Sequence, residues 1–218
     1  MQPIIAFLAS QSILIPIIIG LVKFKTIRPD YWPFYLDLVL GLFTEIISFI
    51  LIQKYGASNA IPTNIFVLIE WTLIVYQFRL WGFLKRNDRY YFFIWSVPIF
   101  IWIIENLVFG KIIAFSPYFR IFYAFLVTIM SITEINYRII HQDKNLFRNP
   151  RFIICIGFIL FFVYEILYEW CYQLSVVEAG TRFTNTIIAL FAYTNALTNI
   201  IFGIAFMLVP ARREFKIE

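Results

Sequence analysis

Apolar runs of about 20 residues recur along the whole chain, separated by short clusters of charged and turn-forming residues. A helix needs about 20 apolar residues to cross the hydrocarbon core of a bilayer. Of the 218 residues, 61% are hydrophobic and only 14% are charged, whereas a soluble domain carries about 25% charged residues. A small water-soluble protein cannot bury this much apolar surface. We therefore expect lipid to be the solvent for most of the chain.

The runs predict an all-α integral membrane protein, a bundle of seven transmembrane helices that forms one domain over residues 1–218. Proline, asparagine and charged residues mark the breaks, as in Arg28-Pro29-Asp30 after the first run and Arg148-Asn149-Pro150 before the sixth. The predicted spans are 3–22, 34–54, 63–83, 90–109, 118–138, 152–175 and 184–209.

The distribution of basic residues predicts the orientation of the bundle. The connections after the first, third and fifth spans and the C-terminal tail hold thirteen Lys and Arg residues, against three in the other connections. Basic connections remain in the cytoplasm, so we expect the N-terminus outside and the C-terminus inside the cell (inner) membrane. The same positions explain the net charge of +5 without a nucleic-acid partner. The first group is Lys23, Lys25, Arg28, Lys85, Arg86, Arg89, Arg138, Lys144, Arg148, Arg151, Arg212, Arg213 and Lys216, and the second is Lys54, Lys111 and Arg182.

Six glutamates lie within predicted spans. An ionised side chain at the centre of a bilayer costs about 2.5–3.5 kcal/mol, so these acids must face the interior of the bundle, carry a proton or pair with a cation. Arg138 follows Glu134 by one helical turn, which predicts an ion pair. We assign Arg79 and Arg120 to helix ends, which leaves the other acids with no basic partner at their depth. The six are Glu45, Glu70, Glu105, Glu134, Glu165 and Glu169.

Helical spacing places many polar residues on common stripes that we expect to face inward. Asp37 begins one such stripe, near an interface where water can solvate it. The stripes are Asp37, Gly41, Thr44, Glu45 and Ser48 in the second span, Thr63, Glu70 and Gln77 in the third, and Ala192, Asn195, Ala196, Asn199 and Gly203 in the seventh.

These patterns favour a multi-pass protein that binds a small polar or cationic ligand in a carboxylate-rich cavity, for proton-coupled transport or sensing. An acid with a neighbouring indole can attract an organic cation through charge and cation–π attraction. The simpler interpretation is that the glutamates hydrogen-bond across helices, with Asn195 and Asn199 as partners. The candidate ligand-binding residues are Glu45, Glu70, Glu105, Glu165, Glu169, Asn195, Asn199 and Trp102.

Several classes of membrane protein are excluded by what the spans lack. All lysines lie in the predicted connections, at a span end or in the tail, which argues against a retinal Schiff base in the helix core. The single histidine, His141, lies in a connection, which excludes a multi-histidine zinc site or a Ser–His dyad in the membrane. Cys155 and Cys171 are sixteen residues apart in one predicted helix and do not pair with each other. No phosphate-binding motif occurs. We therefore expect neither a metal nor a cofactor.

Two alternative functions remain open at this stage. An intramembrane enzyme acting on lipid would use two carboxyl groups as general acid and base, with Glu45 and Glu165 as the candidate pair. A structural subunit of a membrane complex would present its acids to lipid, for a partner helix to cover. A sensor would also need a membrane or cytoplasmic signalling partner, at the connection 139–151 and the basic tail. The acid set favours a binding protein over an enzyme.

Overall fold

The computed structural model describes residues 11–83, 88–141, 145–177 and 181–210, and all regular secondary structure in these ranges is helical. A 3-10 turn, Gln11–Ile13, leads into α2, another, Pro29–Tyr31, leads into α3, and α5 continues into a π-helical turn, Ile104–Val108. The α-helices are α2 (Leu14–Val22), α3 (Trp32–Tyr55), α4 (Ala60–Trp81), α5 (Asp88–Ile103), α6 (Pro117–His141), α7 (Pro150–Val177) and α8 (Thr181–Leu208).

Six helices of the described ranges are long and apolar enough to cross a membrane. They correspond to the second to seventh predicted spans, with ends that differ by a few residues. The predicted first span, 3–22, begins in residues outside the described ranges, and its remainder, Gln11–Val22, is a shorter apolar helix. The structure therefore supports a multi-pass helical membrane protein, while the first span, and with it the count of seven, and the orientation of the bundle stay predictions.

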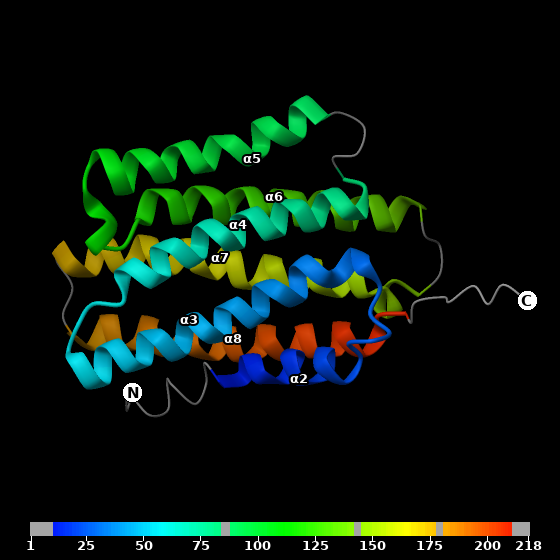
Figure 1. Cartoon of the computed structure of the whole chain (residues 1–218), viewed down its shortest axis with the longest axis horizontal. Helices are drawn as coiled ribbons and strands as arrows, with labels where there is room; N and C mark the ends of the chain where they lie inside the picture. Colours follow the sequence, from blue (N-terminus) through cyan, green and yellow to red (C-terminus); the bar gives the residue numbers. More distant parts are fainter. Residues whose placement is uncertain (1–10, 84–87, 142–144, 178–180, 211–218) are drawn as a thin grey trace, which may run out of the picture.

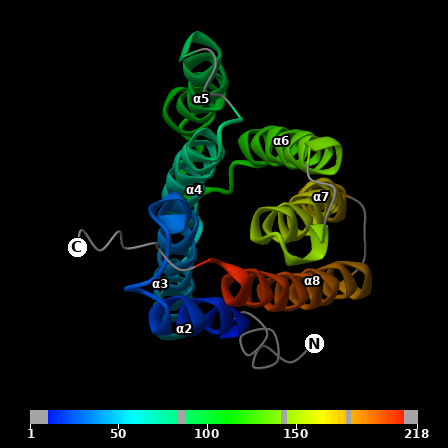
Figure 2. The same cartoon turned by 90° about the vertical axis from the view of Figure 1, so that its right-hand side faces the viewer.

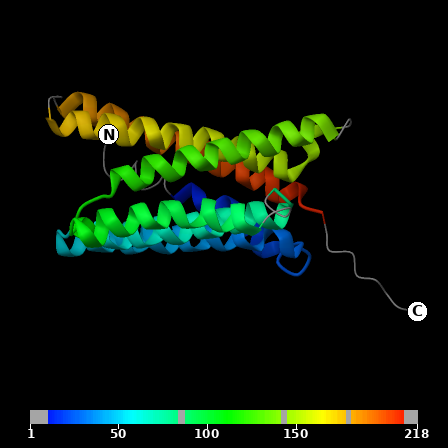
Figure 3. The ribbon, with the colours of Figure 1, turned by 90° about the horizontal axis from the view of Figure 1, so that it is seen from above.

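The helices form two layers (Figure 3). One layer contains α3, α4 and α5, and the other contains α6, α7 and α8. Helix α2 packs against α3 and α8 at one edge, and α6 contacts α4 and α5 at the other (Figure 2). Successive helices run in opposite directions (Figure 1). We call the end where α2 joins α3 and α6 leads to α7 the basic end, because it carries most of the Lys and Arg residues.

Glycines at two helix ends adopt backbone angles that favour glycine. Gly56 follows α3 with φ of 58°, and Gly82 follows α4 with φ of 102°. A residue in the left-handed region ends a helix by satisfying its last carbonyls. The Gly56 N–H donates to Ile52 O at 3.2 Å, and the next N–H, of Ala57, donates to Leu51 O at 3.1 Å. Both helices end where the sequence predicts a break, within two residues.

Aromatic rings join the two layers beside the site described below. Phe34 of α3 lies with its ring centroid 5.5 Å from that of Phe158 on α7 and 4.8 Å from that of Phe202 on α8. Gly157 makes room for this cluster, because a Cβ atom at that position would lie 2.3 Å from the Phe202 ring. Helices α7 and α8 therefore approach closely.

The start of α3 is held by a side chain of α4. The Gln77 side chain is fully buried. Its Oε1 accepts a hydrogen bond from the Phe34 N–H at 3.0 Å, and its Nε2 donates to the backbone oxygen of Asp30. An unpaired N–H in the first turn of a helix needs such a partner when it is buried. Gln77 thus fixes where α3 begins relative to α4.

Candidate functional site

A cavity of about 290 Å³ lies between the two layers. This volume is close to the lower end of the range of about 300–1,000 Å³ for small-molecule sites. Both layers contribute polar side chains to its wall. These are Asp37, Thr44, Glu45, Ser48, Asn59, Thr63 and Glu70 from α3, α4 and the connection between them, and Arg120, Glu165, Tyr168, Asn195, Thr198 and Asn199 from α6, α7 and α8.

The predicted stripe on α3 lines this cavity in full, from Asp37 through Gly41 and Glu45 to Ser48. Asp37, which the sequence places near an interface, is only 6% exposed and belongs to the buried wall of the cavity. Helix α3 begins at Trp32, so Asp37 lies in its second turn and faces the space between the layers. A helical period of 3.6 residues puts all five positions on one face.

Tyr123 of α6 is fully buried and connects two of the predicted acids. Its hydroxyl oxygen lies 2.8 Å from Glu70 Oε2 and 3.2 Å from each carboxyl oxygen of Glu165. A phenol has one proton to donate, so it can donate to only one of the two acids. For both contacts to be hydrogen bonds, the other acid must carry a proton and donate it to the phenol oxygen. Two hydrogen bonds to this phenol therefore require a second proton in the group Glu70–Tyr123–Glu165.

The guanidinium of Arg120 is the cation of this site. Its NH1 lies 2.7 Å from Glu169 Oε1, and the two side chains are 11% and 3% exposed. The expectation that Glu169 has no basic partner at its depth is therefore wrong. Arg120 lies in the first turn of α6, but its long side chain reaches across to α7 and also lines the cavity. Its buried Nε has no hydrogen-bond partner among the described residues.

Two further polar atoms in the cavity wall lack partners. Asp37 Oδ1 and Thr198 Oγ1 are buried, and neither has a hydrogen bond within the described part of the chain. More than about 90% of buried polar groups in proteins have a partner. Since both residues line the cavity, a molecule bound there can satisfy these atoms.

The asparagines of α8 bond to each other and to a neighbouring helix. Asn199 Nδ2 donates to Asn195 Oδ1 at 3.2 Å and to Ser12 Oγ at 2.9 Å. The interpretation that Asn195 and Asn199 serve as partners of the glutamates is thus not supported by the hydrogen bonds of the described residues. Both side chains line the cavity and remain candidates for ligand contact.

Glu105 does not line the cavity; it caps the start of α6. Its carboxylate accepts hydrogen bonds from the N–H groups of Tyr118 at 3.3 Å and Phe119 at 2.8 Å. A carboxylate at a helix N-terminus satisfies free N–H groups and complements the helix dipole. The sequence alone gave no sign of this role, because Glu105 and the residues that it caps belong to different helices.

Trp102 also lies away from the cavity wall. Its indole Nε1 donates to the backbone oxygen of Asn64 at 2.9 Å, which ties α5 to α4. The side chain of Asn64 in turn donates to the backbone oxygen of Ala114 at 2.7 Å. The structure therefore brings Glu45, Glu70, Glu165, Asn195 and Asn199 around one cavity, and Glu169 behind it through Arg120, but not Glu105 or Trp102.

The ion pair predicted within α6 is present. Arg138 Nε and NH2 donate to Glu134 Oε1 at 2.8 and 2.6 Å. This pair lies toward the basic end, away from the cavity. No group of three or more His, Cys, Asp or Glu side chains in the described ranges is arranged to hold a metal ion.

The sequence reasoning missed Tyr123 and Arg120 as site residues, although α6 carries a signal for both. Buried side chains, all but one of them polar, recur along one of its faces every three to four residues. That period indicates a stripe that faces the interior of the bundle. The stripe is hard to recognise from the sequence because Tyr123 lies among apolar residues and looks like one of them. The stripe is Arg120, Tyr123, Val127, Ser131, Glu134 and Arg138.

Comparisons of the chain with protein-family models, curated proteins and solved structures found no match. Two observations bear on the alternative functions raised by the sequence. A structural subunit calls for acids that face lipid, but Glu70, Glu165 and Glu169 are buried. The two acids of the candidate enzyme pair, Glu45 and Glu165, both line the cavity, and the described hydrogen bonds of Glu165 go to Tyr123.

Proposed function

We propose that the chain binds a small polar or cationic ligand in the cavity between its two helical layers and couples this binding to movement of a proton, in transport or in sensing. The observation that carries the proposal is the buried group Glu70–Tyr123–Glu165, in which one phenol hydroxyl lies within hydrogen-bond distance of two acids. A ligand with an N–H or O–H donor can hydrogen-bond to the second acid of this group, which can then release its proton.

The charges around the cavity favour a ligand with positive charge or with several hydrogen-bond donors. Four carboxyl groups line it, from Asp37, Glu45, Glu70 and Glu165, and Arg120 is the one guanidinium among its described lining residues. That guanidinium is already paired with Glu169. Buried charges are costly unless they are paired, so an incoming ammonium group or a set of hydroxyl donors complements this wall.

Most of the remaining wall is aromatic, which favours an organic ligand over a bare ion. The faces of aromatic rings attract organic cations when a positive group lies within about 6 Å of the ring centre. Rings also supply apolar contact for the carbon atoms of a small molecule. The lining rings are Phe66, Phe115, Phe158, Phe161, Phe162, Tyr168, Phe191 and Phe202.

Liposomes that contain the purified full chain and a trapped pH dye test the proposal. Small organic amines and neutral polyols of similar size are added outside, one at a time. At least one amine is expected to change the internal pH in a saturable way, and Glu165→Gln is expected to abolish the response. Asp88→Asn is the matched control, because that carboxylate is exposed and lies outside the cavity.

Ligand-induced stabilisation separates the two forms of the proposal. A sensor is expected to show a higher thermal unfolding midpoint with an amine but no change of internal pH, and a transporter shows both. An equal response of Glu165→Gln and the unmodified chain in both measurements contradicts the proposal. So does the lack of any response, in either measurement, to the whole panel.

A further inference from the structure

A second cavity opens at the basic end of the bundle and is lined by arginines. Its volume is about 740 Å³, and its charged lining residues are Arg28, Arg138, Arg148 and Arg151. They come from four places in the chain: the connection between α2 and α3, the end of α6, the turn before α7 and the first turn of α7. The fold therefore gathers four guanidinium groups around one opening.

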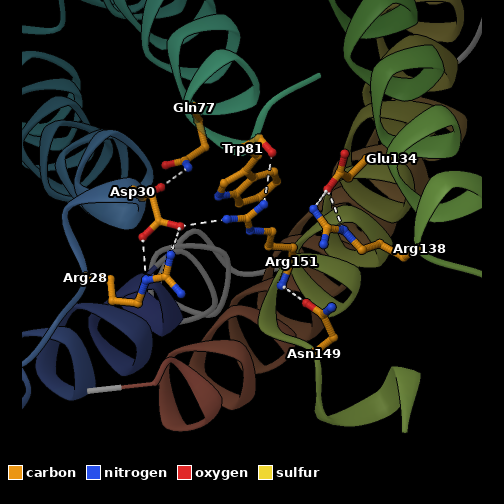
Figure 4. Close-up of polar contacts among 8 residues, drawn as sticks. All are labelled: Arg28, Asp30, Gln77, Trp81, Glu134, Arg138, Asn149 and Arg151. Carbon is orange, nitrogen blue, oxygen red and sulfur yellow. Dashed lines mark hydrogen bonds and ion pairs between the residues drawn. The ribbon is translucent and has the colours of Figure 1, made fainter. Parts of the chain in front are cut away.

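Two of these guanidinium groups are held in place by Asp30 (Figure 4). Its carboxylate accepts from Arg28 Nε at 3.0 Å and from Arg151 NH2 at 2.8 Å. Arg151 NH1 also donates to the backbone oxygen of Trp81 at 3.0 Å. The backbone of Asp30 is bonded to Gln77. Arg151, at 15% side-chain exposure, is thus a fixed donor at the cavity wall.

The cavity carries an excess of positive charge. Asp30 pairs with Arg28 and Arg151, and Glu134 pairs with Arg138. Neither acid is among the lining residues, so the charged side chains that line the opening are all guanidinium groups. Arg148 is exposed and has no ion pair in the described part of the chain. Among the described residues, four cations against two acids leave two positive charges uncompensated.

Membrane topology alone does not account for this arrangement. The positive-inside rule places Lys and Arg on one side without distinguishing between them and without gathering them at one point. Here all four lining cations are arginine. The planar guanidinium fork binds phosphate oxygens with two parallel hydrogen bonds, which a lysine ammonium cannot do. Basic pockets between the ends of membrane helices are suited to anionic head groups.

We propose that this cavity binds a phosphate group, carried either by an anionic phospholipid of the adjacent leaflet or by soluble phosphate. The proposal does not rest on the function of the cavity between the layers. Arg151 and Arg138, which are fixed by their acids, line the wall, and the exposed Arg28 and Arg148 contact the phosphate from outside.

The lipid source is tested with the full chain in nanodiscs that contain phosphatidylcholine and phosphatidylglycerol in equal amounts. Native mass spectrometry counts the lipids that remain bound. Selective retention of phosphatidylglycerol is expected. It should weaken about fivefold in Arg148→Gln and about thirtyfold in Arg28→Gln/Arg148→Gln, since each arginine near an anionic surface contributes a comparable increment. Both residues are exposed, so the buried Arg138–Glu134 pair stays intact.

Lys25→Gln is the matched control, because Lys25 is exposed in the connection that also carries Arg28 but does not line the cavity. Inorganic phosphate is titrated onto the protein in nanodiscs of phosphatidylcholine alone, with the thermal unfolding midpoint as the readout. If inorganic phosphate raises the unfolding midpoint and Arg148→Gln loses this effect, the source is soluble phosphate. If phosphatidylglycerol is selectively retained and Arg148→Gln loses this retention, the source is the lipid. The proposal is overturned if neither is seen, or if Lys25→Gln loses as much as Arg148→Gln.

Discussion

The hydroxyl of Tyr123 lies 2.8 Å from the carboxyl oxygen of Glu70, and this hydrogen bond crosses from one helical layer to the other. Glu165, on the same layer as Tyr123, lies 3.2 Å from the same hydroxyl. Two hydrogen bonds among these three side chains require two protons, and the group is buried beside the cavity. The first two predictions follow from this group.

Replacing Tyr123 by phenylalanine removes the hydroxyl and leaves two buried acids without their shared partner. We expect the free energy of unfolding to fall by about 1–3 kcal/mol, the usual cost of an unpaired buried polar group. Unfolding of the protein in detergent by added denaturant measures this change. Tyr118→Phe is the control, because Tyr118 lies on the same helix and is 64% exposed. Equal stability of the two variants would contradict the proposed hydrogen bonding.

Glu70→Gln and Glu165→Gln are expected to have unequal effects on stability. A glutamine amide can donate a hydrogen bond to the Tyr123 oxygen as a protonated acid does, but it carries no charge. The substitution should therefore be mild at the acid that already holds the proton and harmful at the other. Unfolding of the two variants under the same conditions measures the difference. Equal losses at the two positions argue against a single additional proton.

Arg120→Gln should be strongly destabilising, because it leaves Glu169 as a buried charge without a partner. Breaking one side of a buried ion pair costs about 3–5 kcal/mol. The double variant Arg120→Gln/Glu169→Gln should regain part of this loss, and a double-mutant cycle measures the coupling. The exposed pair Arg79–Asp88, at 2.9 Å, is the control, and Arg79→Gln should change stability by less than about 1 kcal/mol. A similar loss in both single variants is inconsistent with a buried pair.

Gly157→Ala should force α7 and α8 apart. The added methyl group would lie 2.3 Å from the Phe202 ring, and overpacking of this kind costs about 1–3 kcal/mol. Combining it with Phe202→Leu should recover part of the lost stability, because leucine has no ring at the position of the clash. Thermal unfolding of the single and double variants measures both effects. A stable Gly157→Ala would show that the ring moves aside freely.

The predicted orientation is tested with single cysteines in a chain whose Cys155 and Cys171 are replaced by alanine. A cysteine in place of Lys54 should react with a membrane-impermeant reagent in intact cells. One in place of Lys25 should react only after the membrane is opened. Both positions are exposed, at opposite ends of the bundle. Labelling of both from the same side would overturn the predicted topology.

The features that could be predicted from the sequence are those whose residues all lie on one helix. The stripe of Asp37, Gly41 and Glu45 follows from the helical period, and the Glu134–Arg138 pair follows from the spacing of one turn. Both require only that the segment be helical. Composition and run length establish that condition in a chain with this many apolar residues.

The parts that the sequence could not supply depend on which helices pack together. Glu70 and Glu165 lie 53 and 42 residues from Tyr123 along the chain, and no local pattern joins them. Arg120 was assigned to a helix end, yet its flexible side chain carries the charge away from its backbone position. Glu105 has the composition of a ligand-binding acid, but packing turns it into a helix cap.

The hydrogen bond between Glu70 and Tyr123 limits how the two layers can move apart. Since its two ends belong to different layers, any opening of the bundle that separates α4 from α6 must break it. If Glu70 is the acid without a proton, it then needs a proton or a cationic ligand to compensate its buried charge. Under the proposed function, separation of α4 from α6 and uptake of a proton or a cation therefore occur together.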